Sequence, residues 1–465
     1  MTETEPRLIS TPSATADSRR WWLLAGMGGT IGVVLLDETV VATALPTIRD
    51  TLAETQIASH WVINAYLLVF AGFAAAGGKL GDIFGQRAPF LAGLALFGLS
   101  SFACGLAQSG GWLITARAIQ GGGAAVIFPL SMAMVTIAFP AAQRGVALGI
   151  YGAIGSTFLA LGPLVGGFFT ELISWRWIFW INPAIAVAIA LIVLTTWRDP
   201  PRKGAQRARI DFPGLISLVG SLSMLVFAVM QGPVWGWGHP AILALLGGGG
   251  ALLMVFIRVE ARRRMPLIEV ALFRGASFRV CNLVVFAAQV SKIAAIVFGA
   301  LYLQDEVKMS PLTAGLALLP AVGPWPFMST PSGRLADRYG ARPVVLWGLA
   351  LTGAAFLWLS LAARADDYLL LTPGLLLWGV GAIILFAPAR SAVMNACPAE
   401  KHGQVGGILI TAQILGGTIG MAVCGTLYAT THSFAAVFLA TAGFVLAVFV
   451  LGWRAIERRP VQATT

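Results

Sequence analysis

Long apolar stretches separated by short polar links run along almost the whole chain. Each stretch is close to the roughly 20 residues that a helix needs to cross about 30 Å of hydrocarbon. The fourteen stretches of this length are 21–45, 58–78, 88–107, 111–135, 145–169, 178–197, 212–231, 240–257, 276–303, 311–331, 342–363, 368–392, 404–428 and 433–454. The pattern therefore predicts an all-α polytopic membrane protein with fourteen transmembrane (TM) helices.

The composition supports a lipid-facing surface. Hydrophobic residues make up 57% of the 465 residues, and charged residues only 11%. A soluble globular domain carries about 25% charged residues, because its surface faces water. The 54 glycines also suit helices that pack closely in lipid.

The net charge of +11 alone would also suit a nucleic-acid partner, but its distribution indicates membrane topology. With the N-terminus inside, 25 of the 31 Lys and Arg residues fall on inner segments, and Arg117 and Lys292 fall inside spans. The outer loops carry only four: Arg49, Arg176, Lys308 and Arg364. Positive charge favours the cytoplasmic side, so both termini are predicted to be cytoplasmic. The basic clusters 198–209 and 258–264 are better explained as orientation signals than as partner sites.

The remaining chemistry-bearing residues form no familiar site. The four cysteines (Cys104, Cys281, Cys397 and Cys424) have no paired extracellular spacing, and the four histidines have no metal-ligand spacing. A phosphate-binding loop, a nucleophile elbow and a zinc-protease motif are also missing from the sequence. We therefore expect no disulfide, no metal, no cofactor and no enzyme activity.

An internal repeat sets the domain organisation. The segment 78–87 recurs at 333–342, an offset of 255, and the glycines from Gly121 recur from Gly379, an offset of 258. Spans 1–6 are thus repeated in the same orientation as spans 9–14, which is typical of transporters built from two parallel six-helix halves. The predicted parts are a cytoplasmic N-tail (1–20), an N-terminal bundle (21–200), two inserted spans (201–265), a C-terminal bundle (266–454) and a cytoplasmic C-tail (455–465).

Four motifs carry a family resemblance. The segment 36–46 is similar to a first-helix motif, with Ala42 where asparagine is usual, and 117–123 matches a fourth-helix motif. The inner-loop motif and its copy comprise Gly78, Asp82, Gly85, Arg87, Gly333, Asp337, Gly340 and Arg342. The antiporter motif comprises Gly162, Pro163, Gly166 and Gly167, preceded by Phe158 where the pattern has glycine. The chain resembles the fourteen-spanner drug:proton antiporter branch of the major facilitator superfamily.

This resemblance implies a proton-driven antiporter that exports small amphipathic drugs or antibiotics by alternating access. It implies a multi-pass protein of the bacterial cell (inner) membrane, powered by the proton gradient. The expected partners are a small-molecule substrate, protons and lipid, without nucleic acid, and the expected state is a monomer. Proton-coupled uptake, or export of a specific metabolite, is the alternative, which the Gly162-Pro163 motif disfavours.

Four ionisable residues lie more than five positions from either end of a span: Asp37, Glu38, Arg117 and Lys292. Such residues are costly in hydrocarbon and mark transport paths by default. Rise per residue places Asp37 and Arg117 at similar depth in the outer half, and Glu38 lies about 100° around the helix from Asp37. We hypothesise that Asp37 carries the coupling proton and Arg117 releases it, whereas Glu38 is a second proton site or a counter-charge for a cation. A static Asp37–Arg117 brace is the alternative. The inserted spans are expected to carry no such charge.

Lys292 stands at the repeat counterpart of Asp37, at an offset of 255. A lysine there disfavours simple lipophilic cations; it would bind an anionic or zwitterionic cargo, neutralise Glu38, or extend to the membrane interface. The other candidates for the substrate cavity, each also explained by an interhelical hydrogen bond, are Asn64, Tyr66, Gln120, Gln289 and Gln413.

The two loop motifs are predicted to form an inner gate. Gly85 and Gly340 suit a tight turn, and Asp82 and Asp337 are expected near helix ends or near cations of the opposite half. The alternative is a simple turn with an orientation charge. The Gly162-Pro163 pair is expected to bend its helix and seal the closed state, or to form only a packing notch.

Overall fold

A computed structural model describes residues 14–199, 212–262, 273–365, 367–395 and 402–455. The tails before residue 14 and after 455, Cys397, most of the basic cluster 198–209 and the end of the cluster 258–264 lie outside the described residues. Almost everything described is helical. The helices are α1 (Ala14–Thr51), α2 (Gln56–Phe84), α3 (Arg87–Gly105), α4 (Gly110–Ala138), α5 (Ala141–Leu172), α6 (Trp177–Thr196), α7 (Phe212–Trp235), α8 (Pro240–Arg262), α9 (Ala276–Lys292), the π-helix η2 (Ile293–Phe298), α10 (Gly299–Asp305), α11 (Pro311–Ala317), α12 (Leu319–Val322), α13 (Pro324–Tyr339), α14 (Ala341–Ala362), α15 (Tyr368–Asn395), α16 (His402–Thr431) and α17 (Phe434–Ala455).

Thirteen of the described helical segments are long and apolar enough to cross a membrane, with α9, η2 and α10 counted as one segment. The predicted all-helical polytopic fold is thus confirmed. The segment 311–331, predicted as one span, is helical but is divided into α11, α12 and α13, so it is not one continuous helix. Each of the three helices has a proline in its first turn. Proline has no backbone N–H and its ring clashes with the carbonyl one turn earlier, so it interrupts a helix.

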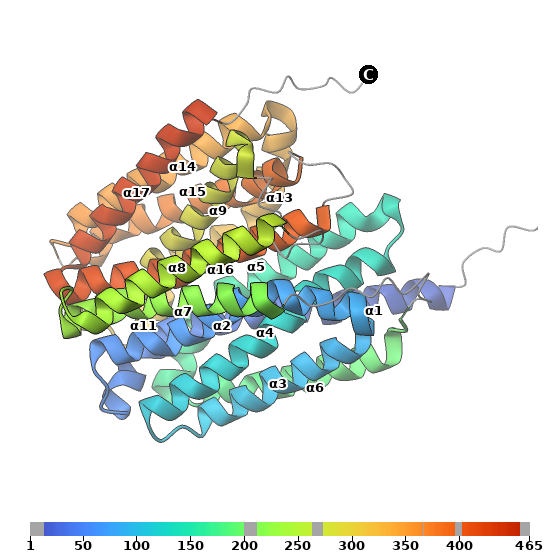
Figure 1. Ribbon diagram of the computed structural model, residues 1–465, viewed down its shortest axis with the longest axis horizontal. Helices are drawn as coiled ribbons and strands as arrows, with labels where there is room; N and C mark the ends of the chain where they lie inside the picture. The colour runs from blue at the N-terminus through green and yellow to red at the C-terminus, as the bar shows by residue number, and fades with distance from the viewer. Residues whose placement is uncertain (1–13, 200–211, 263–272, 366, 396–401, 456–465) are drawn as a thin grey trace, which may run out of the picture.

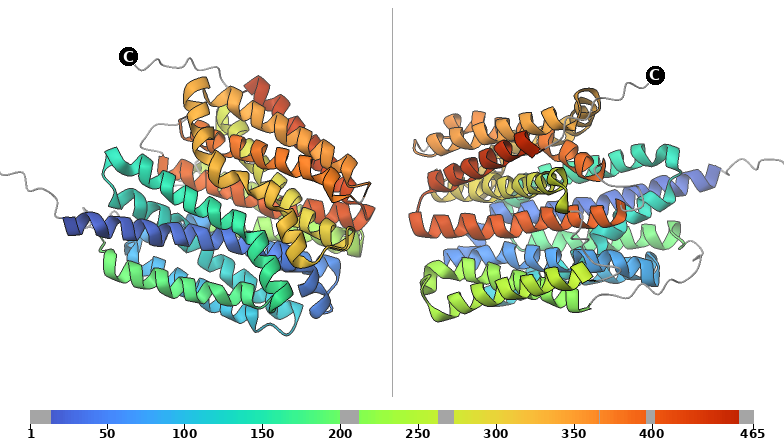
Figure 2. Two further views of the ribbon diagram at one scale, coloured as in Figure 1. Left: turned by 180° about the vertical axis from the view of Figure 1, so that it is seen from behind. Right: turned by 45° about the horizontal axis from the view of Figure 1, so that its top comes forward.

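The helices pack as two groups with an inserted pair (Figures 1 and 2). In the first group, α1 packs on α5 and α6, and α4 packs on α2 and α3. In the second, α14 packs on α15 and α17, and α9 packs on α15 and α16. The groups meet along two seams, α2 against α16 and α5 against α11–α13. Helices α7 and α8 pack on each other, and α7 covers the first seam by contacting α2 and α16.

The internal repeat appears as the same close helix contacts in both groups. A Cβ placed on Gly121 of α4 would lie 2.3 Å from the Tyr66 carbonyl oxygen, and one on Gly379 of α15 would lie 2.3 Å from the Ala321 carbonyl oxygen. Tyr66 and Ala321 are themselves 255 residues apart. Glycine is required at both positions, because any side chain would collide with backbone. The repeated glycines therefore fix the same helix crossing twice.

Burial distinguishes the centre of the molecule from its periphery. In the most apolar stretch of α1, 89% of the residues are buried, and the same share is buried in the segment formed by α9, η2 and α10. In the corresponding stretch of α8 only 17% are buried. Helix α8 is therefore peripheral, whereas α7, with 50% of its most apolar stretch buried, covers the first seam. Helix α8 continues beyond the predicted span 240–257 to Arg262, and Glu260 in this extension is only 2% exposed.

Candidate transport site

Asp37, in α1, is completely buried and is contacted by side chains from two other helices. Its Oδ1 accepts hydrogen bonds from the amide of Gln120 on α4 at 3.0 Å and from that of Asn182 on α6 at 2.9 Å. Its Oδ2 pairs with Nη1 of Arg117 on α4 at 2.5 Å. Three side-chain donors from α4 and α6 therefore converge on one buried carboxylate.

Arg117 has partners besides Asp37. Its Nε donates to the Val62 carbonyl oxygen at 3.0 Å, and its Nη1 donates to Gln120 Oε1 at 2.8 Å. Its guanidinium carbon lies 4.2 Å from the centroid of the Tyr66 ring, which is a cation–π distance. Protonation of Asp37 would therefore leave the arginine with acceptors. Tyr66 OH, in turn, has no hydrogen-bond partner among the described residues.

Asn182 is a member of this network that was not predicted from the sequence. Besides Asp37, its amide donates to Ser101 Oγ on α3 at 3.0 Å, and Ser101 donates to the Phe179 carbonyl oxygen at 2.8 Å. The signal that could have revealed it is an isolated asparagine in the otherwise apolar span 178–197, next to Pro183. The complete network lies within α1, α2, α3, α4 and α6, and thus within the first group of helices.

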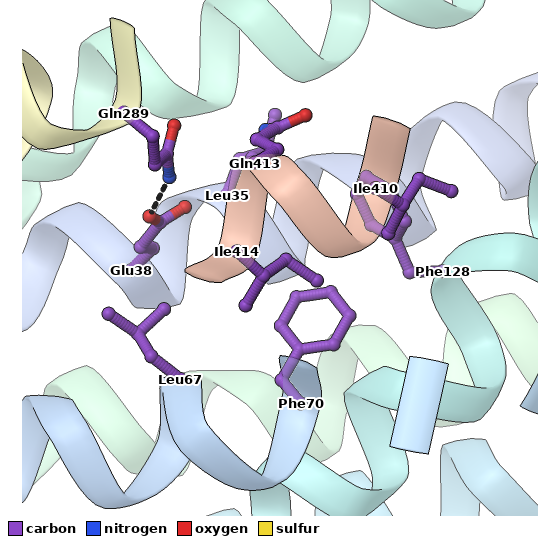
Figure 3. A pocket seen from close by; sticks show the side chains of 9 residues that line it. All are labelled: Leu35, Glu38, Leu67, Phe70, Phe128, Gln289, Ile410, Gln413 and Ile414. Carbon is purple, nitrogen blue, oxygen red and sulfur yellow. Dashed lines mark hydrogen bonds between the residues drawn. The ribbon is translucent and has the colours of Figure 1, made fainter. Parts of the chain in front are cut away.

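Glu38 points to the other group of helices. Its Oε1 lies 2.6 Å from Nζ of Lys292. The same oxygen accepts a hydrogen bond of 2.7 Å from Gln289 Nε2 (Figure 3). Both partners are on α9, one turn apart. The Glu38 and Lys292 side chains are only 8% and 4% exposed. Adjacent carboxylates on α1 therefore serve different networks, one within a group and one between the groups.

A small pocket lies beside the Glu38 pair, and its walls come from both groups of helices (Figure 3). The lining residues are Leu35, Glu38, Leu67, Phe70, Phe128, Gln289, Ile410, Gln413 and Ile414. Its free space holds about one water molecule, so the two groups are closed around it.

The predicted cavity residues divide between three places. Gln289 and Gln413 line the pocket, and Lys292 pairs with a residue of its wall. Gln120 and Tyr66 instead surround Arg117, away from the pocket lining. Asn64 is also displaced from the expected cavity, because its amide donates to Met230 Sδ of the inserted α7 at 2.8 Å.

The end of the molecule that holds the links 52–55 and 306–310, here called the distal end, is closed by contacts between the groups. Arg49 on α1 makes a bidentate pair with Asp305 on α10, at 3.1 and 3.2 Å. Glu171 on α5 accepts a hydrogen bond of 2.8 Å from the backbone N–H of Leu312 at the start of α11. Neither contact was predicted from the sequence, in which Arg49 was assigned to a loop.

The antiporter motif lies where α5 crosses α1 and α11. A Cβ on Gly162 would collide with Thr39 of α1, and one on Gly166 would lie 2.4 Å from the Val40 carbonyl oxygen. A Cβ on Gly167 would lie 2.4 Å from the Pro311 carbonyl oxygen of the other group. Helix α5 continues through Pro163, so the expected bend stays a prediction. The motif permits close helix crossings near the distal end.

The loop motifs form matching turns at the opposite, proximal end. Gly85 and Gly340 have φ angles of 87° and 84°, which favour glycine. Gly78 and Asp82 lie on α2, and Gly333 and Asp337 lie on α13. The side-chain surroundings of both aspartates lie outside the described residues, so their latching role stays a prediction.

The two motif arginines make equivalent contacts that were not predicted from the sequence. Arg87 donates from Nη2 to the Leu194 carbonyl oxygen at the end of α6, at 3.0 Å. Arg342 donates from Nη2 to the Trp453 carbonyl oxygen at the end of α17, at 2.6 Å. Unpaired carbonyls at a helix C-terminus attract cations, so each arginine ties two helices of its own group together.

Within the described part of the chain, no three His, Cys, Asp or Glu side chains are placed to hold a metal ion. The candidate site therefore consists of two buried ion pairs, Asp37–Arg117 and Glu38–Lys292, and a small, mostly apolar pocket.

Comparison with known proteins agrees with this architecture. Residues 27–273 and 280–465 match the family model of the Major Facilitator Superfamily. The fold is similar to that of a POT family peptide transporter (TM-score 0.69, 16% identity, 96% of this chain and 98% of that one). It is also similar to that of the nucleoside transporter NupG (TM-score 0.68, 12% identity, 94% of this chain and 100% of that one).

Curated relatives are named for antibiotic resistance or export. A tetracenomycin C resistance and export protein of Streptomyces glaucescens is 31% identical, over 92% of this chain and 80% of the relative. A puromycin resistance protein of Streptomyces alboniger is also 31% identical, over 96% and 93%. A cephamycin export protein of Amycolatopsis lactamdurans is 33% identical, over 90% and 89%. The chain therefore belongs to the major facilitator superfamily of membrane transport proteins, among relatives named for antibiotic resistance and export.

Proposed function

We propose that this protein is a proton-driven antiporter that exports small amphipathic drugs or antibiotics across the cytoplasmic membrane of a bacterium by alternating access. The relatives named for tetracenomycin C, puromycin and cephamycin support antibiotics as the cargo class. The inward bias of Lys and Arg supports an orientation with both termini in the cytoplasm.

The buried Asp37 network is the observation that carries the proposal. An acidic group inside a membrane protein is expensive and marks an ion or proton path by default. Arg117 and two amides contact Asp37, and Arg117 also has the Val62 and Gln120 acceptors. Asp37 can therefore alternate between the two protonation states without leaving the arginine isolated.

The contacts at the distal end support alternating access. The cross-group pair Arg49–Asp305 and the Glu171–Leu312 bond must separate if that end is to open. The glycines of α5 let it lie directly against α1 and α11 in the closed arrangement. Helix pairs in such close contact can move apart as rigid bodies, which is the motion expected of two-bundle transporters.

A drug-accumulation assay tests the coupling. In cells that lack their own efflux pumps, wild-type protein is expected to lower the accumulation of at least one compound in a panel of cationic, anionic, neutral and zwitterionic antibiotics, and an uncoupler is expected to abolish this effect. Asp37→Asn removes the titrating group but retains one oxygen for the Gln120 or Asn182 amide. We expect it to reduce uncoupler-sensitive export at least tenfold.

Asp50→Asn is the matched control, because Asp50 lies on the same helix with its side chain 70% exposed. It is expected to export the same compound at the wild-type rate. Uncoupler-sensitive export by Asp37→Asn would leave the static brace as the role of this network. Increased accumulation in cells with wild-type protein would indicate uptake instead of export.

A further inference from the structure

The Glu38–Lys292 pair is an opposite-charge pair that joins the two groups of helices through the centre of the molecule. Its atoms are 2.6 Å apart, and both side chains are almost fully buried. The two described contacts of Glu38, with Lys292 and with Gln289, are both made by the same carboxylate oxygen, Oε1. Separation of α1 from α9 during transport would leave an acid on one wall and a base on the other.

The surroundings of the pair are apolar. Six of the nine residues that line the adjacent pocket are Leu, Ile or Phe, and two of the other three are glutamines. Figure 3 shows Gln289 directed toward the Glu38 carboxylate, with Leu67 and Phe70 below it. A buried charge whose partner is removed is strongly destabilising in such surroundings. Any cargo that enters by widening this space therefore has to satisfy both charges.

Charge balance separates the classes of cargo. A lipophilic monocation would pair with Glu38 and leave Lys292 unpaired, and a monoanion would do the reverse. A neutral cargo would satisfy neither charge. A molecule with an apolar body, one cationic group and one anionic group would pair with Glu38 and Lys292 together, and the site would remain neutral.

We propose that the cargo of this transporter is a zwitterionic amphiphile that separates Glu38 from Lys292 and pairs with both. The proposal rests on the transport function proposed above and specifies its substrate class. The two carboxylates of α1 then have different roles, since Asp37, inside one group of helices, serves the proton, and Glu38, between the groups, serves the cargo.

A matched pair of dyes tests the substrate class by equilibrium binding to purified protein in lipid nanodiscs, at constant pH and without a gradient. Rhodamine B carries a carboxylate and a delocalised cation, whereas its ethyl ester has the same rings and only the cation. We expect wild-type protein to bind rhodamine B at least tenfold more tightly than the ester. In Lys292→Gln the affinity for rhodamine B is expected to fall at least tenfold, and that for the ester to stay constant or rise.

Two further variants make the result independent of folding. The charge-exchanged double variant Glu38→Lys with Lys292→Glu keeps an ion pair and is expected to retain the preference for rhodamine B. The exposed loop residue Arg364 gives the charge control Arg364→Gln, which should bind both dyes as wild type does. Equal wild-type affinity for the two dyes, binding of neither, or an equal loss for both dyes in Lys292→Gln would overturn the proposal.

The variant Asp37→Asn separates this proposal from the proton-coupling proposal. The hydrogen-bond network of Asp37 lies within the first group of helices, so the dye preference of Asp37→Asn is expected to be the same as that of wild type. If uncouplers prove to have no effect on transport but the dyes are still distinguished, the coupling proposal fails and the substrate class stands. If transport is proton-driven but the dyes are not distinguished, the coupling proposal stands and the substrate-class proposal fails.

Discussion

The first and second halves of the molecule share a scaffold but differ in their chemistry. At equivalent positions of the repeat, the first half has Asp37 and Arg117 where the second has Lys292 and Leu375. Gln120, which contacts Asp37, has Trp378 as its counterpart, and that indole donates to Ser291 Oγ on α9 at 3.2 Å. The glycine crossings of α4 and α15, by contrast, are the same in both halves. Backbone packing was therefore retained in both halves, while the charged network exists in only one.

The central helices of the two halves also differ in backbone geometry. Helix α1 is continuous past Glu38, whereas the equivalent position in the second half begins the π-helix η2, directly after Lys292. Short π-helical segments inside α-helices are rare and are frequent at functional sites. The second half, which contains the π-helix, therefore supplies Lys292, and the first half, with the continuous α1, supplies Glu38. The difference in backbone geometry thus lies at the contact between the two halves.

The largest expected effect comes from giving the first half the residue of the second. Arg117→Leu removes the partner of a completely buried carboxylate and is expected to destabilise the protein by about 3–5 kcal/mol and to abolish export. Unfolding is measured by heating in detergent with a thiol-reactive dye, because Cys104, Cys281 and Cys424 are buried.

The double variant Asp37→Asn with Arg117→Leu serves as its control. It leaves no unpaired charge, so it is expected to be more stable than Arg117→Leu alone but still inactive in proton-driven export. If Arg117→Leu were as stable as wild type, the buried pair would not contribute to the stability of the first half.

An intermediate effect is expected at the repeated crossings. Gly121→Ala and Gly379→Ala each place a Cβ against backbone oxygen and should each lower stability by about 1–3 kcal/mol. Gly250→Ala, on α8, is the control because its Cβ would meet no atom within 4 Å. Comparable losses at Gly121 and Gly379, measured by the same unfolding assay, would sharpen the view of a shared scaffold. A loss at only one of them would contradict it.

The smallest effect is expected at the proximal end. Arg87→Ala and Arg342→Ala each remove one exposed hydrogen bond to a helix C-terminus and should each cost about 1 kcal/mol. Arg364→Ala, which removes an exposed loop arginine, should leave the unfolding temperature unchanged. A large loss of transport without a loss of stability would instead assign these arginines to the inner gate.

Much of the fold could be predicted from the sequence because a membrane imposes one dominant constraint, that backbone polar groups be satisfied within helices. Periodic apolar stretches therefore predicted nearly every long helix, and the repeated motif predicted the two halves. The segment 311–331 was predicted as one helix but forms three, α11, α12 and α13, each with a proline in its first turn. Hydropathy reports length and polarity, and it does not register where the helical hydrogen bonds are interrupted.

The site was less predictable than the fold. Arg117 and Asp37 could be placed at similar depth by helix rise, because both positions follow from where their helices enter the membrane. Asn64 was assigned to the cavity but contacts the inserted α7, because the face that a residue presents depends on which neighbour covers it. Asn182 was missed for the same reason.

The sequence by itself determined the membrane class, the two-fold repeat and the identity of the four charges that lie well inside the predicted spans. These follow from composition and spacing, which act locally along the chain. Only the tertiary structure decided that Asp37 is held within one half and Glu38 is paired across to Lys292, a residue about 250 positions away. The direction of a side chain in a bundle depends on helix rotation and on close crossings such as that at Gly121, which are set by packing between distant segments.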